Sequence, residues 1–110
     1  MYGMYGSQSI LVLAAMAIAT VAAQGQQAGD VQKGSLLARE VCAECHAVER
    51  QDRPSPNPSS PTFATVAGTP GMSEAALNAI LHTSHRSMPN IVLDPAQTAD
   101  VTAYILSLKK

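Results

Sequence analysis

Cys42-Ala43-Glu44-Cys45-His46 holds both cysteines of this 110-residue chain and places a histidine directly after the second one. On a helix, side chains three and four residues apart lie on the same face. The two thiols can therefore form thioethers with the vinyl groups on one edge of a porphyrin, while the histidine binds the iron axially. The C-x-x-C-H spacing is typical of haem attachment, and it predicts one covalently bound haem.

Two other kinds of site use a C-x-x-C pair. A thioredoxin-like redox pair is disfavoured, because the chain shows no alternation of strand and helix patterns. A structural zinc site would need further ligands, and the sequence contains no second pair of cysteines. Haem attachment remains the interpretation of this motif.

The chain begins with the features of a secretory signal peptide. Residues 10–23 are apolar and rich in alanine, but they are shorter than the ~20 residues that span a bilayer. Val21-Ala22-Ala23 supplies the small residues that a cleavage site requires. Residues 1–9 lack Lys and Arg, which departs from the usual pattern and leaves an uncleaved membrane anchor as the alternative.

Export agrees with the cysteine motif, because thioether attachment of haem takes place outside the cytoplasm in bacteria. The periplasm is therefore the expected location, with a membrane-anchored form facing the periplasm as the alternative. Membrane contact is expected only through partner complexes or an uncleaved signal. The expected organisation is a signal peptide at 1–23, a flexible lead-in at 24–29 and one domain at 30–110.

Helix caps and apolar periodicity predict an all-α domain. Asp30 can cap a first helix, Ser73 a second that runs to about Thr83, and Asp94 a third with Pro95 in its first turn. Residues 51–61 contain four prolines, which exclude a regular helix or central strand there. Apolar stripes predict the buried faces as Val31, Gly34, Ala38, Val41 and Cys45, then Leu77, Ile80 and Leu81, then Val101, Tyr104, Ile105 and Leu108.

The second axial ligand has several candidates. His82 lies on the polar side of a helix and is expected at the surface. Met88 lies in an aperiodic segment before Pro89, an unusual place for a core methionine, and its soft thioether suits haem iron. We predict Met88 as the ligand, with His85 as the alternative. For His46, a carbonyl of the proline-rich segment can accept the ring N–H, and Pro61 is the candidate.

These motifs together resemble those of the class I cytochromes c, particularly the small bacterial ones, over nearly all of the mature chain expected at residues 24–110. The resemblance rests on Gly34, on the C-x-x-C-H motif, on Pro61-Thr62-Phe63, on Met88-Pro89-Asn90, and on Tyr104 in the last helix.

The resemblance implies the cytochrome c fold, with three to four short helices and long irregular loops around one haem c. It also implies that the first and last helices cross at Gly34 and Tyr104, that Pro61 binds His46, and that Met88 is the sixth ligand. The chain has Ala38 where many relatives have an aromatic, so the crossing should be tighter or less well filled. The tryptophan that some relatives use to bind a propionate is absent, which leaves Ser84, Arg86 and Asn90 as candidates.

With both axial positions filled, no coordination position remains for a substrate. We therefore expect an electron carrier rather than an enzyme, a periplasmic monomer that cycles its haem between Fe(III) and Fe(II). Its partners would be redox protein donors and acceptors that dock transiently at the haem edge. The formal net charge of -1 and the absence of a basic patch argue against nucleic acid. The alternatives are a haem-based ligand-binding or catalytic subunit, and a fixed electron-transfer subunit of a larger oxidoreductase complex.

Overall fold

The computed structural model of the chain describes residues 28–51, 53–83 and 87–110. The signal peptide expected at 1–23, most of the lead-in, and His85 lie outside these residues, as do Ser84 and Arg86. The described residues form helices and no strand, which confirms the all-α fold. None of the described helices is long and apolar enough to cross a membrane. The elements are α1 (Val31–Leu37), the π-helical segment η1 (Ala38–Cys42), α2 (Phe63–Gly68), α3 (Glu74–Leu81) and α4 (Pro95–Ser107).

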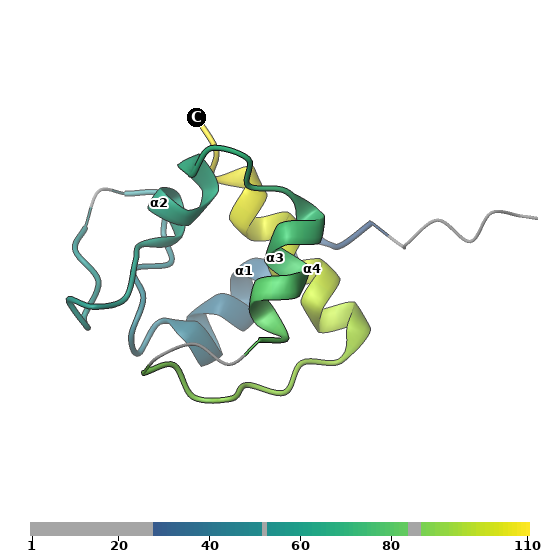
Figure 1. Cartoon of the computed structure of the whole chain (residues 1–110), viewed down its shortest axis with the longest axis horizontal. Helices are drawn as coiled ribbons and strands as arrows, with labels where there is room; N and C mark the ends of the chain where they lie inside the picture. Colours follow the sequence, from purple (N-terminus) through teal and green to yellow (C-terminus); the bar gives the residue numbers. More distant parts are fainter. Residues whose placement is uncertain (1–27, 52, 84–86) are drawn as a thin grey trace, which may run out of the picture.

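Helix α4 is the central element, and α1, α2 and α3 all pack against it (Figure 1). The apolar stripe predicted for this helix is confirmed, because each of its members is at most 6 % exposed. Other core side chains reach the same cluster from η1, α2, α3 and the segment after the C-x-x-C-H motif, while Leu37 of α1 is only partly buried against it. The buried apolar core consists of Ala38, Val48, Phe63, Ala67, Leu77, Val101, Tyr104, Ile105 and Leu108.

Helix α1 crosses α4 at Gly34. A Cβ atom at this position would lie 2.0 Å from the carbonyl oxygen of Asp100 and 2.8 Å from Cβ of Tyr104. The predicted pairing of Gly34 with Tyr104 is therefore confirmed, and the crossing is tight, with Ala38 fully buried beside it. Gly29 approaches α4 equally closely, since its Cβ would lie 1.8 Å from the carbonyl oxygen of Ala99. Gly29, directly before the cap residue Asp30, therefore also lies against α4.

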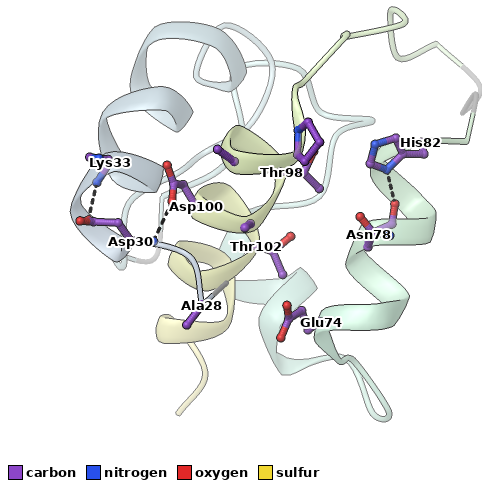
Figure 2. Close-up of a pocket in the computed structure, with 12 residues that line it drawn as sticks. Ala28, Asp30, Lys33, Glu74, Asn78, His82, Thr98, Asp100 and Thr102 are labelled. Carbon is purple, nitrogen blue, oxygen red and sulfur yellow. Dashed lines mark hydrogen bonds between the residues drawn. The ribbon is translucent and has the colours of Figure 1, made fainter. Parts of the chain in front are cut away.

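The three predicted helix caps are present. Asp30 accepts a 3.0 Å hydrogen bond from the amide of Lys33, and its own amide donates to Asp100 over 2.7 Å, which ties the start of α1 to α4 (Figure 2). Ser73 caps α3 by accepting from the amide of Ala76. Asp94 forms the capping box of α4 with Gln97. These bonds satisfy amides that a helix start leaves without an intrahelical partner.

The first helix differs from the uninterrupted α-helical stripe that the sequence predicts. At Ala38 its backbone changes to π-type hydrogen bonding, and the amide of Ala43 binds the carbonyl of Ala38 over 3.0 Å. One additional residue in a turn rotates every later side chain by about 100° relative to a regular α-helix. Val41 is consequently 39 % exposed instead of buried, while Cys42 is half-buried and packs against the core.

Helix α2 has no counterpart among the helices that periodicity predicts. It begins directly after the proline-rich segment, where the side chain of Thr62 caps it by accepting from the amide of Thr65. Only six residues long, it contributes Phe63 and Ala67 to the core. Such a short helix presents too few turns for an apolar period to stand out. The sequence feature that could have indicated this helix is Thr62, a residue type that commonly caps helix starts.

Candidate functional site

The C-x-x-C-H motif forms a compact turn at the end of η1. The carbonyl of Cys42 accepts hydrogen bonds from the amides of Cys45 and His46, at 3.2 and 2.9 Å. Both cysteines are free thiols and both are half-buried. Burial raises the pKa of the Cys42 thiol, so this side chain is held in its neutral form. A thioether is also neutral, and this partly apolar position can hold one without burying a charge.

The ring of His46 is fixed by the proline-rich segment. Its Nδ1 lies 2.7 Å from the carbonyl oxygen of Pro61, the contact that the sequence analysis assigns to this proline. Because a carbonyl can only accept, Nδ1 carries the proton and Nε2 keeps a free lone pair. The ring of buried Phe63 packs against the imidazole, with centroids 5.4 Å apart and planes tilted by 47°. The tautomer and the orientation of His46 therefore suit a metal ligand that binds through Nε2.

Residues 53–63, here called the proline strap, are also bonded to the main chain on either side of His46. The amide of Asn57 donates to the carbonyl of Cys45 over 3.2 Å. On the other side, the amide of Ala47 donates to Oγ of Ser55 over 3.0 Å, and its carbonyl accepts from the amide of Phe63 over 2.9 Å. The proline strap thus forms hydrogen bonds with Cys45 and His46, the last two residues of the motif, and with Ala47, the residue that follows it.

Residues 48–50 connect the motif to the rest of the fold. The hydroxyl of Tyr104 donates to the carbonyl of Val48 over 2.5 Å, and the guanidinium of Arg50 donates to the carbonyl of Ser107 over 2.7 Å. Arg39, in η1, donates through Nε to Glu49 over 2.7 Å, and this guanidinium holds the pKa of the Glu49 carboxyl below its usual range. Since both side chains of that ion pair are about half exposed, its contribution to stability is small.

Met88 lies in the irregular segment between α3 and α4, half-buried in a groove that also includes Leu81 and Leu93. Ser87, directly before it, has φ of 65°, a left-handed conformation that is uncommon for a residue with a side chain. His82 is exposed, as the sequence predicts, and its Nδ1 lies 2.7 Å from the carbonyl oxygen of Asn78 in its own helix.

The sequence pattern of the family described as "Cytochrome c" matches residues 31–109. The chain belongs to the cytochrome c family. It is 35 % identical over 82 residues to cytochrome c-552 of Bradyrhizobium diazoefficiens, an alignment that covers 74 % of this chain and 78 % of the relative. No solved structure matches the chain.

Cytochromes c carry covalently bound haem c, typically one in a small chain of this kind, and they transfer electrons between redox partners. The donor set of this cytochrome fits that cofactor. The two thiols lie on one turn, the imidazole has Nδ1 engaged and Nε2 free, and the surrounding partly buried side chains are apolar. Those packed against the core near the motif include Cys42, Ala43 and Val66.

Two contributors to this cytochrome's site were missed by sequence reasoning. Ser55 and Asn57 lie in the proline-rich segment, for which the sequence predicts only the contact of Pro61 with His46. Their signal is the bracketing of each polar residue by prolines, at 54, 56 and 58. That pattern indicates a stiff segment, but it does not indicate which amide or carbonyl the segment will meet.

Tyr104 provides a pH-dependent test of this arrangement. Burial and the nearby carboxylate of Glu49 raise the pKa of Tyr104. Because the folded-state pKa lies above the unfolded value of about 10, the resulting stability is fully present below that pH. It is lost as the pH rises through the folded-state pKa, since a phenolate cannot donate to Val48.

We expect the Tyr104→Phe variant to lose about 1 kcal/mol in free energy of unfolding at neutral pH, the usual net value of one hydrogen bond. The variant should also show a smaller decline in stability above pH 10 than the parent. Urea unfolding at a series of pH values measures both effects. Parallel declines in the two proteins would show that Tyr104 does not carry the alkaline dependence.

Proposed function

We propose that this cytochrome is a one-electron carrier in which Cys42 and Cys45 hold the haem and His46 and Met88 are the axial ligands. The observation that supports this most directly is the 2.7 Å contact between Nδ1 of His46 and the Pro61 carbonyl. It sets the tautomer that leaves Nε2 available. The haem, when bound, supplies the Fe(III)/Fe(II) couple.

In this function the polypeptide keeps the two axial ligands in a fixed geometry. An imidazole and a thioether are both neutral, and methionine ligation favours the reduced state relative to a second histidine. With His46 and Met88 as the axial pair, no position stays open for a substrate, so the site suits transfer rather than catalysis. The bonds from the proline strap and from Tyr104 limit rearrangement of the segment that carries the histidine.

We further propose that the protein is exported to the periplasm by residues 1–23 and works there as a monomeric domain of residues 30–110. Its donors and acceptors would be redox proteins that dock transiently at the haem edge. Such encounters usually bury less than ~1,200 Å².

Intact-mass analysis of protein from a host that matures c-type cytochromes tests attachment and export together. The expected mass is that of a chain starting at Gln24 plus one haem. A Cys42→Ser, Cys45→Ser double variant serves as the control and should have the mass of its polypeptide alone. A wild-type chain without a haem adduct would contradict the proposed function, and an adduct on the full-length chain would contradict signal cleavage alone.

A further inference from the structure

The hydrogen bonds around His46 engage both peptide groups that flank it. One flanking group joins Cys45 to His46, and its carbonyl accepts from the amide of Asn57 while its N–H donates to Cys42. The other joins His46 to Ala47, and its N–H donates to Oγ of Ser55 over 3.0 Å. The backbone of the histidine is therefore held on both sides, independently of the bond from its ring.

Ser55 differs from the other strap contacts because it acts through its side chain. An alanine at this position would remove the acceptor and leave the partly buried Ala47 N–H without its partner, which costs more than the hydrogen bond contributes. The remaining hydrogen bonds from the strap to residues 45–47 use main-chain atoms of the strap. Ser55 is consequently the position where one side-chain substitution can test the restraint on His46.

The two prolines that flank Ser55 restrict the backbone conformations that the segment can adopt. Pro54 has a fixed φ, and Pro56 restricts the residue before it to extended or polyproline conformations. Much of the conformational entropy that Ser55 would lose on binding is therefore already absent from the unfolded chain. The Pro-Ser-Pro sequence holds a hydroxyl acceptor in place at low entropic cost.

We propose that Ser55, bracketed by Pro54 and Pro56, is a positioning residue for the axial histidine. By restraining the peptide group after His46, it keeps the imidazole aligned with the Pro61 carbonyl. That alignment maintains the polarisation of the ring N–H, which raises the basicity of Nε2 and favours the ferric state. This inference rests on the proposed function, because it assigns His46 to the iron.

The test compares three holoprotein variants with the wild type. In Ser55→Ala, hydrogen exchange of the Ala47 amide, followed by NMR, should accelerate about tenfold relative to amides of the α1–α4 core. The ferrous-to-ferric ratio at the wild-type midpoint potential should rise about threefold. Ser55→Thr keeps the hydroxyl and should restore both values, while Ser59→Ala, at an exposed position of the same strap, should change neither.

Two results would overturn the assignment. One is an unchanged Ala47 exchange rate in Ser55→Ala, and the other is an acceleration shared equally by the core amides, which would indicate general destabilisation. If Ser55→Ala does not mature, Pro56→Ala keeps the hydroxyl but loosens its backbone, and should accelerate Ala47 exchange about threefold. An unchanged rate there would equally overturn the proposal. Failure of the proposed function is distinguishable, because the wild type itself would then lack covalent haem.

Discussion

Replacing Gly34 with alanine is expected to destabilise the protein by about 3 kcal/mol or more. The new Cβ would lie 2.0 Å from the carbonyl oxygen of Asp100 and 2.5 Å from its carbonyl carbon. These are main-chain atoms in the middle of α4, so the overlap cannot be relieved by turning a side chain. The helices must move apart, which reduces core packing and strains the bond from Asp30 to Asp100.

Gly68→Ala is the matched control. Gly68 ends α2, and a Cβ there would meet no heavy atom within 4 Å. Its substitution should change the free energy of unfolding by less than about 1 kcal/mol, and in the stabilising direction, because alanine restricts the unfolded chain. Urea unfolding followed by circular dichroism measures both variants. A Gly34→Ala protein as stable as the Gly68→Ala protein would be incompatible with the close crossing of α1 and α4.

Because we propose Met88 as the sixth ligand of the haem iron, replacing it with alanine should change the electronic state of the haem without removing it. Alanine offers no donor atom, so the oxidised protein should lose its methionine-to-iron charge-transfer band and the reduced protein should bind carbon monoxide. The reduction potential should fall by on the order of 100 mV, because axial ligands are a main determinant of haem potential. An optical redox titration records the band and the potential in one experiment.

Met72→Leu is the control for loss of a methionine as such. Met72 packs against the core from a partly buried position, and leucine has a similar volume, so stability should change by less than about 1.5 kcal/mol with the band retained. The His85→Ala variant tests His85, the alternative candidate for the sixth ligand. A charge-transfer band that survives in Met88→Ala would exclude Met88 as the sixth ligand, and a spectrum altered only by His85→Ala would assign that role to the histidine.

Elements that are stabilised by hydrogen bonds between residues close together in the chain could be predicted from the sequence. Asp30, Ser73 and Asp94 each cap a helix by binding an amide three residues later, so the pattern is complete within one turn. The buried face of α4 can be predicted in the same way, because its thirteen residues form an apolar stripe over several turns. The spacing of the two cysteines and the histidine is a local feature of the same kind.

Other features either have no mark in the local sequence or depend on contacts between residues far apart in the chain. The π-helical turn at Ala38 moves Val41 outward, and the sequence of this segment contains no proline or glycine to mark the change. Helix α2 is too short to show a period, and its position depends on packing of Phe63 and Ala67 against the core. The expected burial of Val31 and of Ile80 is also wrong, since these residues are 39 % and 36 % exposed.

The sequence alone determined the C-x-x-C-H motif, the helix caps and the stripe of the last helix, because each is encoded by residues within a few positions of one another. Tertiary structure alone decided that Asp100 lies against Gly34 and that Ser55 meets the amide of Ala47. A serine hydroxyl in a proline-rich loop can accept from any nearby donor. Only the folded path of the chain, with the strap closed over His46, selects the one it binds.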